Sequence, residues 1–248
     1  MKRICLFILS LALAVVSSQP ASCAEPAGVL RVLFLGHDSP HHNSNVYEPL
    51  LASALEADGI TFDYFTKPDC LTADTLQRYD AVMLYANHGR ITPEQFDALN
   101  SFIQGGRGFL PIHCASACFG HEPRFVSLVG GRFKSHKSGV FKPVILTPSH
   151  PIFEGVKEYE TWDETYVHSE INTANRELLM ERREEGHTEP WTWTRTEGKG
   201  RVFYTASGHD ERTWKDPQFQ RMLRNAIVWS VGEERKASWE KSRATPRP

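Results

Sequence analysis

The sequence lacks any hydrophobic run long enough to cross a membrane. Its longest apolar stretch, Ile4–Val16, covers about 13 residues, whereas a bilayer-spanning helix needs roughly 20. A basic start before this stretch and the small residues Ser22–Ala24 after it are typical of a secretory signal cleaved near Ala24. We therefore expect residues 1–24 to be a signal peptide and the protein to be secreted or periplasmic, with no transmembrane segment. A lipid anchor at Cys23 is less favoured, because Pro20 stands where such a signal uses an aliphatic residue.

An excess of basic residues is also missing. The chain has 28 Lys and Arg against 30 Asp and Glu, and loss of the signal would remove two basic residues, leaving 26 against 30 and a net charge of −4. This balance argues against a nucleic-acid partner. Cysteine is scarce, with Cys70, Cys114 and Cys118 alone after the signal. An odd number means that at least one thiol stays free or pairs outside the chain, and the spacing of Cys114 and Cys118 does not favour a bridge.

The rest of the chain has the rhythm of one α/β domain, which we place at residues 29–232. Short β-branched strands alternate with helices in the first half, which predicts a mostly parallel sheet with helices on both faces. The second half is richer in strands and turns, and predicts added antiparallel strands. The predicted strands are Leu30–Leu35, Thr61–Phe65, Ala81–Tyr85, Gly108–Ile112, Val144–Leu146, Glu177–Arg182, Pro190–Thr194 and Arg201–Ala206, and the predicted helices are Tyr47–Ala57, Thr92–Gln104 and Pro217–Val231. Residues 233–248 are charged and lack apolar spacing, and we expect a disordered tail there.

The helix at Thr92 has the clearest local signals. Thr92 is a good N-cap, Pro93 suits the first helical position and Gln95 completes a capping box. Gly105 and Gly106 end the helix.

Histidine is abundant, with 11 residues in the chain. Several follow predicted strands: His37, His41 and His42 after the first, His88 after the third, His113 after the fourth and His209 after the last. The loops at the carboxyl ends of parallel strands converge on one crevice. We therefore expect His113 and His209 to share a pocket, although a single loop histidine is more often a bystander.

Aromatic and acidic residues suggest the ligand. Trp162, Asp163, Glu164 and Tyr166 place two carboxylates between aromatic rings, and Trp193 adds a ring with Trp191 on one face of a strand. Aromatic rings cover the C–H faces of sugars while carboxylates accept hydrogen bonds from hydroxyls. The combination favours a small saccharide, although a tryptophan in a strand is more often a core residue.

Seven segments together resemble the ThuA-like (trehalose-utilisation) family, whose fold is similar to that of flavodoxin and the class I glutamine amidotransferases. They are His41–Ser44, Arg78–Val82, Gly105–His113, Leu128–His136, His150–Ile152, Asp163–Tyr166 and Gly200–His209. The resemblance covers the domain from about Leu30 to Gly232. It implies a flavodoxin-like or amidotransferase-like α/β fold and a role in carbohydrate use.

The amidotransferase mechanism itself fits poorly. That fold carries a nucleophilic cysteine in a sharp turn after a strand, with a His-x-Glu partner after a late strand. Here His113 occupies the matching turn and Cys114 comes one place later, while His209 and Glu211 supply a His-x-Glu that other segments also match. A shift of one residue turns the thiol away from the pocket, so we do not expect glutamine hydrolysis.

The leading hypothesis is an exported enzyme of the hydrolase, lyase or isomerase type that acts on a disaccharide or keto-sugar. His113, His209, Asp163 and Glu164 are the candidate catalytic residues. His42, Tyr166, Trp162, Trp193 and His136 are the candidate substrate-binding residues. His42, His113 and His209 could alternatively bind a divalent metal, Zn or Mn, although no His-Glu-x-x-His run is present. A non-catalytic sugar-binding module, an interaction domain and a Cys114-dependent amidohydrolase remain alternatives.

Overall fold

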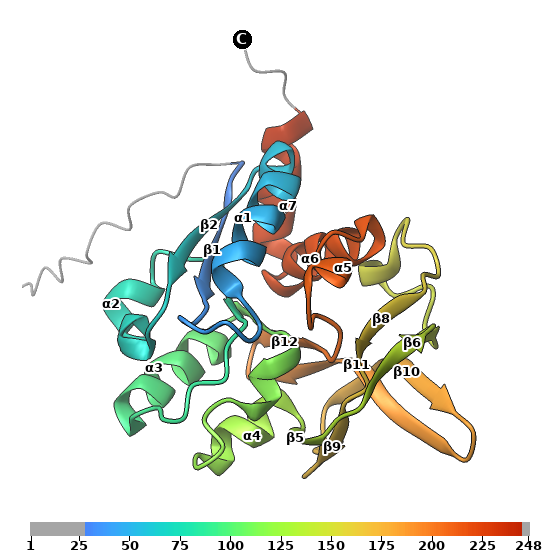
Figure 1. The fold of residues 1–248 in the computed structure, drawn as a ribbon. Coiled ribbons are helices and arrows are strands. Elements are labelled where there is room, and N and C mark those ends of the chain that lie inside the picture. The colour runs from blue at the N-terminus through green and yellow to red at the C-terminus, as the bar shows by residue number, and fades with distance from the viewer. Residues whose placement is uncertain (1–27, 245–248) are drawn as a thin grey trace, which may run out of the picture.

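A computed structural model describes residues 28–244 as an α/β sandwich around one eight-stranded sheet (Figure 1). The sheet order is β2-β1-β3-β4-β12-β11-β10-β7. The five strands from β2 to β12 run parallel, whereas β11, β10 and β7 add antiparallel to the far edge. This confirms the expected α/β class, with antiparallel strands added by the second half of the chain. The predicted signal peptide lies outside the described residues.

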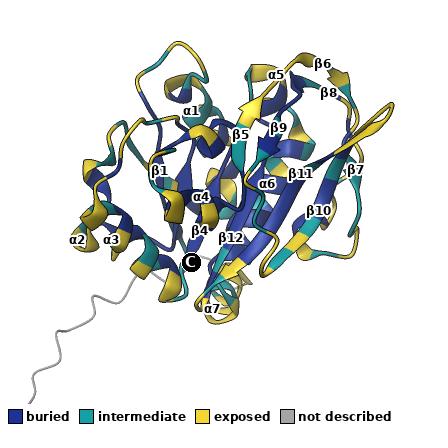
Figure 2. Cartoon of the chain, turned by 90° about the horizontal axis from the view of Figure 1, so that it is seen from below, coloured by how far each residue is buried: buried dark blue, intermediate teal, exposed yellow. Residues whose placement is uncertain are grey.

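The sheet strands agree closely with the sequence predictions. Their bounds are β1 Leu30–Leu35, β2 Ile60–Phe65, β3 Ala81–Leu84, β4 Gly108–Pro111, β7 Val144–Ile145, β10 Arg176–Glu184, β11 His187–Glu197 and β12 Gly200–Thr205. The four inner parallel strands, β1, β3, β4 and β12, are nearly continuous runs of buried residues, as expected for strands covered on both faces. In Figure 2 they form a dark blue core beneath helices with exposed outer sides.

Helices cover both faces of the parallel half. On one face α1 (Ser44–Leu55) and α6 (Pro217–Ser230) pack together, with α5 (Glu211–Trp214) against both. The other face carries α2 (Ala73–Leu76), α3 (Pro93–Gln104) and α4 (Pro123–Val129). The capping box predicted at Thr92 is present, since Thr92 Oγ1 accepts from the Gln95 amide and the Gln95 side chain accepts from the Thr92 amide. No helix in residues 28–244 is long and apolar enough to span a membrane.

Two small antiparallel ladders were not predicted. One pairs β5 (Arg132–Ser135) with β9 (Val167–Ser169), and the other pairs β6 (Ser138–Phe141) with β8 (Thr161–Glu164). Both lie beside the carboxyl edge of the parallel strands (Figure 1). Their short, mixed sequences carry too little alternation to be recognised, yet β8 and the turn after β5 supply residues of the site described below.

The predicted disordered tail is wrong for most of its length. Residues Glu233–Ala244 form helix α7, which packs beside α6 and α1. One apolar side chain, Trp239, is buried there between the guanidinium groups of Arg224 and Arg243. Arg235 adds an ion pair with the buried Asp80. A single buried ring and these pairs hold a helix that has no amphipathic stripe in its sequence.

Candidate metal centre

Four side chains meet at the carboxyl edge of the parallel strands. They are His42 from the loop between β1 and α1, His113 directly after β4, Glu164 at the end of β8 and His209 in the loop after β12. One ligand atom from each lies within 4.8 Å of all the others. Strands β1, β4 and β12 place the three histidines at one sheet edge, as the parallel topology predicts. The expected convergence of His113 and His209 is therefore observed.

Glu164 is the centre of the cluster. Its Oε2 lies 3.2 Å from His113 Nε2 and 3.5 Å from His42 Nε2. Its Oε1 lies 3.2 Å from His209 Nδ1 and 3.4 Å from His136 Nδ1. Burial acts to raise the pKa of Glu164, but the contacts from His113, His209 and His42 outweigh it and hold the pKa well below the usual range. Glu164 is therefore a carboxylate at neutral pH.

The hydrogen bonds of His113 determine which of its nitrogens faces the cluster. Nδ1 lies 2.6 Å from the backbone carbonyl of Ala206, so Nδ1 carries the proton and donates it. The remaining atom, Nε2, faces a carboxylate oxygen of Glu164 at 3.2 Å. A nitrogen lone pair and a carboxylate repel each other unless a proton or a metal ion lies between them.

The separations also fit a bound metal ion. A charge-assisted hydrogen bond between nitrogen and carboxylate usually measures about 2.7–2.9 Å. Two ligands that each lie about 2.1 Å from one metal, at angles between 90° and 110°, are about 3.0–3.4 Å apart. The contacts of Glu164 with His113, His209 and His42 measure 3.2, 3.2 and 3.5 Å. Each carboxylate oxygen thus has one 3.2 Å contact, with His113 or His209, at a separation that also fits neighbouring ligands of one ion.

Two more nitrogens of the cluster are short of partners. Nδ1 of His42 and Nδ1 of His209 are buried and make no hydrogen bond. His209 Nδ1 nevertheless lies 3.2 Å from Glu164 Oε1, and this contact raises the pKa of His209. Burial lowers the pKa of His42 to about 4, so its ring is neutral and its lone pair is available at neutral pH. Imidazoles and a carboxylate are a ligand set suited to a transition metal.

The backbone at two of the histidines is strained. His42 has φ 54° and His113 has φ 49°, the left-handed region that side chains other than glycine seldom adopt. Such residues tend to cluster at functional sites, where the surrounding structure holds them in place. Around His42, the carbonyl lies 3.0 Å from His37 Nε2, and His88 in turn contacts the carbonyl of Gly36 at 2.9 Å. His37 and His88 therefore support the loop that carries His42 and are not members of the cluster.

Asp163 lies next to the cluster but its oxygens face away from it. It is fully buried, and its carboxylate accepts hydrogen bonds from the amides of Glu164, Gly208 and His209 and from the Thr213 hydroxyl, at 2.8–3.1 Å. These contacts tie the end of β8 to the loop after β12. Asp163 thus positions Glu164 and His209 relative to each other. Because Asp163 and Glu164 are adjacent in sequence, the sequence alone could not show that they have different roles.

The backbone conformation and the close packing at position 208 require glycine. Its φ is 136°, and a Cβ added there would lie 3.2 Å from Cβ of His113. Its carbonyl accepts hydrogen bonds from the Tyr85 hydroxyl at 2.7 Å and the Trp214 indole at 2.9 Å. Neither Tyr85 nor Trp214 was singled out from the sequence, because each has the pattern of an ordinary core aromatic.

Three of the predicted substrate-binding residues surround the cluster. Tyr166 stacks on His113 with ring centroids 4.1 Å apart. Trp162 lies 5.7 Å from His209, and the guanidinium of Arg212 covers its ring at 3.5 Å. His136 contacts Glu164 from the solvent side, with 40% of its side chain exposed.

Trp193 does not belong to this group. Its side chain is fully buried, and its indole donates to the Val129 carbonyl at 2.8 Å. It packs on Tyr204 with ring centroids 4.3 Å apart. The prediction of a substrate contact at Trp193 is therefore wrong, because the ring fills the core behind the site.

The cysteines are poor nucleophiles. Cys70, Cys114 and Cys118 are buried and unpaired. Burial raises the pKa of the Cys114 and Cys118 thiols well above the usual range and that of Cys70 to about 12. A catalytic thiol needs a lowered pKa and access to substrate. Cys114 has neither, which speaks against an amidohydrolase built on it.

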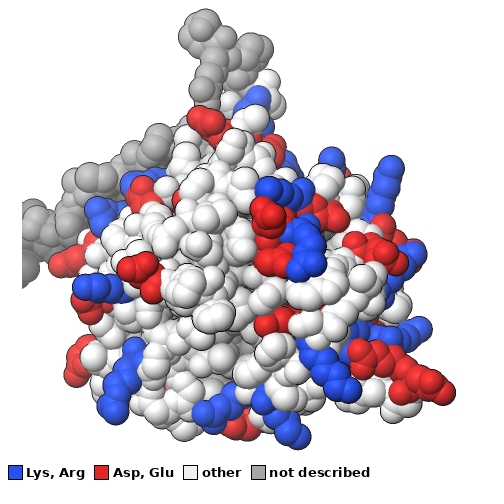
Figure 3. Space-filling model, in the orientation of Figure 1, with Lys and Arg blue, Asp and Glu red and all other residues white. Residues whose placement is uncertain are grey.

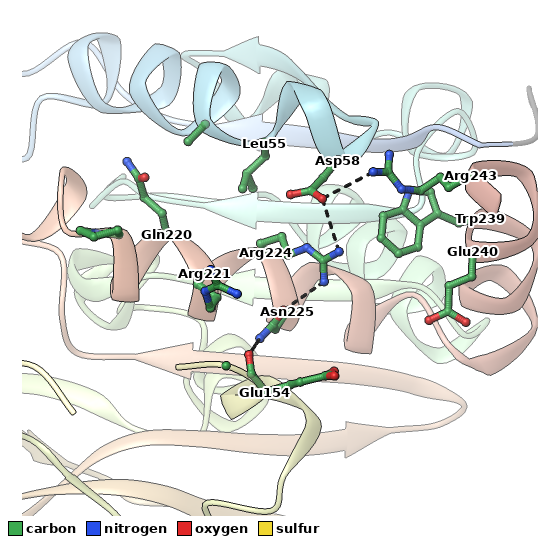
Figure 4. Close-up of a pocket in the computed structure, with 13 residues that line it drawn as sticks. Leu55, Asp58, Glu154, Gln220, Arg221, Arg224, Asn225, Trp239, Glu240 and Arg243 are labelled. Atoms are coloured by element: carbon green, nitrogen blue, oxygen red, sulfur yellow. Dashed lines mark hydrogen bonds and ion pairs between the residues drawn. The ribbon is translucent and has the colours of Figure 1, made fainter. Parts of the chain in front are cut away.

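A groove of about 800 Å³ lies elsewhere, among α1, α6 and α7. No member of the four-residue cluster lines it. Figure 4 shows Asp58 between Arg224 and Arg243, with which it forms ion pairs. On the face drawn in Figure 3, acidic and basic side chains are interspersed around an uncharged middle strip, without a large area of one sign.

Comparison with known proteins agrees with this architecture. Residues 31–230 match the family model named ThuA, described as trehalose utilisation. Similar solved structures include ThuA-like proteins from Bacteroides uniformis and Parabacteroides merdae. The first has a TM-score of 0.71 at 19% identity, covering 85% of this chain and 94% of that one. The second has a TM-score of 0.71 at 18% identity, covering 82% and 90%.

A more distant likeness is to a Thermoplasma acidophilum protein described as part of a GMP synthase. Its TM-score is 0.55 at 15% identity, covering 88% of this chain and 98% of that one. Identities this low establish a shared fold and nothing further, and no curated protein matches the sequence. The family match spans the sheet, the helices on both faces and all four residues of the cluster. The chain therefore belongs to the ThuA family.

Proposed function

We propose that this protein is an exported, metal-dependent enzyme of carbohydrate utilisation, with His42, His113, Glu164 and His209 as the ligands of one divalent ion. The observation that carries the proposal is the arrangement of these side chains. Their ligand atoms lie within 4.8 Å of one another, and the Glu164 carboxylate contacts a ring nitrogen of each of the three histidines at 3.2–3.5 Å. The family description supports the carbohydrate role.

Zn and Mn are the favoured ions. Three imidazoles and one carboxylate form a borderline-soft donor set that suits first-row transition metals better than Mg or Ca, which prefer oxygen ligands. A bound ion of this kind polarises a carbonyl or hydroxyl oxygen of a sugar as a Lewis acid. Hydrolysis, elimination or isomerisation of a disaccharide or keto-sugar requires such polarisation, and these are the proposed reaction types.

The side chains around the cluster would supply acid–base catalysis and contacts with the sugar. His136 is partly exposed and lies 3.4 Å from Glu164, so it borders any molecule that reaches the cluster from solvent. Imidazole is the side chain that most often acts as a general acid or base in enzymes. We assign the acid–base role to His136, because His113 and His209 are occupied as ligands.

Trp162 and Arg212 form the other border. Asp210 holds the Arg212 guanidinium over the indole, and hydrogen bonds from Arg212 Nε to both Asp210 oxygens measure 3.1 and 3.0 Å. Trp162 therefore offers an edge rather than an open face for stacking. The flat guanidinium and the indole edge suit the hydroxyl and C–H groups of a sugar ring.

The decisive experiment is metal analysis of protein purified without a histidine tag. We expect about one Zn or Mn per chain, loss of the ion on treatment with a chelator, and its recovery on reconstitution. The reconstituted protein is then screened against glycosides and their keto derivatives. A stoichiometry near zero with no binding of added Zn or Mn overturns the metal centre. Metal binding and sugar binding without turnover, in both wild type and His136→Gln, identify a sugar-binding module instead.

A further inference from the structure

We infer that Glu189, His168 and Tyr204 form a line of contacting polar side chains, which we call the positioning array. The array contacts the backbone of His113 and holds this residue in the position that metal binding requires. This inference rests on the proposed function. The three residues lie on β11, β9 and β12, in the second half of the chain, whereas His113 follows β4 in the first half. All three are buried, and Tyr204 meets the cluster at the backbone carbonyl of His113.

The array is a continuous line of short polar contacts. Glu189 Oε1 accepts a hydrogen bond from the His168 amide at 2.8 Å and lies 2.9 Å from His168 Nδ1. This double contact turns the other side of the ring, Nε2, towards the Tyr204 hydroxyl at 2.9 Å. The Tyr204 hydroxyl reaches the carbonyl of His113 at 3.2 Å and Ser116 Oγ at 3.0 Å.

The end of this line is a strained position. His113 has φ 49°, a conformation that costs free energy and needs support from its surroundings. Its carbonyl accepts a hydrogen bond from the Ser116 hydroxyl at 3.1 Å, and the Tyr204 hydroxyl, which shares its one proton with His168 Nε2, lies 3.2 Å from the same carbonyl. The hydroxyls of Ser116 and Tyr204 thus both contact the peptide after His113, while the Ala206 carbonyl fixes the ring through Nδ1. Backbone and ring together determine where Nε2 points.

Packing makes the array rigid. Trp193 covers Tyr204 and meets the His168 ring edge-on, with centroids 4.3 and 5.3 Å away. Tyr166 stacks on His113 and lies 6.1 Å from His168. Because this environment excludes water, each polar contact in it is worth more than it would be at the surface. The buried Trp193 thereby acquires a role in the site without contacting a ligand.

The array explains why polar residues occupy the interior at these positions. Burial of Glu189 and His168 costs free energy unless both are fully hydrogen-bonded. A purely structural core would place apolar residues there. Partners that orient a metal-binding histidine justify such a cost, since their loss typically weakens metal affinity about 10- to 100-fold.

The test compares Tyr204→Phe and Glu189→Gln with a matched control, Thr192→Val. Thr192 lies on β11, and its buried hydroxyl pairs with Thr205 of β12 at 2.9 Å, so the control also loses a buried hydroxyl contact between the same strands. Affinity for Zn and Mn is measured by chelator competition, and Tm of the metal-free proteins by calorimetry. We expect metal affinity to fall about tenfold in Tyr204→Phe and Glu189→Gln, and to stay at the wild-type value in Thr192→Val.

The outcomes separate the two proposals. A wild-type protein that binds neither ion overturns the proposed function. Wild-type affinity in folded Tyr204→Phe and Glu189→Gln overturns the array while leaving the metal centre intact. Equal loss of affinity in the Thr192→Val control also overturns it, because the effect would then follow general stability rather than the position of His113. If Tyr204→Phe fails to fold, Glu189→Gln alone decides between these results.

Discussion

Replacing Glu164 with glutamine should abolish most of the stabilisation that a metal gives this protein. Glutamine keeps the shape of the side chain and removes its charge. Glu164 touches all three histidine ligands at 3.2–3.5 Å, so the substitution removes one ligand and the anion that balances the ion. Partners that only orient a ligand contribute about 10- to 100-fold in affinity. Loss of a ligand itself should therefore cost at least 100-fold, or about 2.7 kcal/mol.

That loss translates into a thermal shift. With metal at 100 times the wild-type Kd, binding adds about 2.7 kcal/mol to the free energy of unfolding. For Glu164→Gln the same concentration equals its Kd, and the gain falls to about 0.4 kcal/mol. For a domain of 150–250 residues, 1 kcal/mol moves Tm by about 2–4 °C. The metal-induced shift should thus fall from about 5–11 °C to about 1–2 °C.

The assay is calorimetry of chelator-treated protein with and without Zn or Mn. His41→Gln is the matched control, since His41 neighbours His42 in sequence and lies outside the four-residue cluster. The control should keep the full shift. Equal shifts in wild type and Glu164→Gln would refute the reasoning, because the ion would then bind somewhere that Glu164 does not reach.

Three further predictions concern the rest of the molecule. Iodoacetamide at pH 8 should leave Cys70, Cys114 and Cys118 unmodified in the native protein, since burial raises the pKa of each thiol. In urea, the reagent should alkylate all three. Rapid labelling of Cys114 in the native protein would support a mechanism that uses this thiol. Burial lowers the pKa of His168 below 6.5, so the unfolded chain binds the extra proton first and stability falls as pH drops from 7 to 5. Urea unfolding of the metal-free protein should show a smaller fall in His168→Gln, and an unchanged fall would contradict the buried neutral ring. Trp239→Ala should lower the free energy of unfolding by about 3 kcal/mol. The control Ser238→Ala, on the exposed side of α7, should change this free energy by less than about 0.5 kcal/mol. Equal effects of the two substitutions would mean that the Trp239 ring does not hold α7 in place.

Much of the fold was predictable because its signals are local. Buried strands such as Leu30–Leu35, and helices with caps such as Pro93–Gln104, carry their own pattern. The convergence of His113 and His209 followed from topology alone, since parallel strands end at a common edge. Helix α7 escaped prediction because one buried tryptophan, rather than a periodic stripe, holds it.

The finer assignment of the site depended on three-dimensional information. Asp163 and Glu164 are adjacent, and only the direction of β8 decides that Glu164 faces the histidines while Asp163 binds backbone amides. Trp193 was predicted from the sequence to bind the sugar, yet Tyr204 covers its face of β11. The orienting partner of His113 is a carbonyl, that of Ala206, and a backbone carbonyl leaves no trace in a sequence.

The four candidate ligands are spread from the first strand to the last, and this spread has a consequence for assembly. His113 and Glu164 alone are separated by 51 positions, and His42 and Glu164 by 122. A nascent or truncated chain that has not yet placed β12 in the middle of the sheet offers at most a partial set of donors. Uptake of the proposed ion would therefore come last and bridge both halves of the sheet, so retention of the ion would serve as a direct readout that the whole domain has been completed.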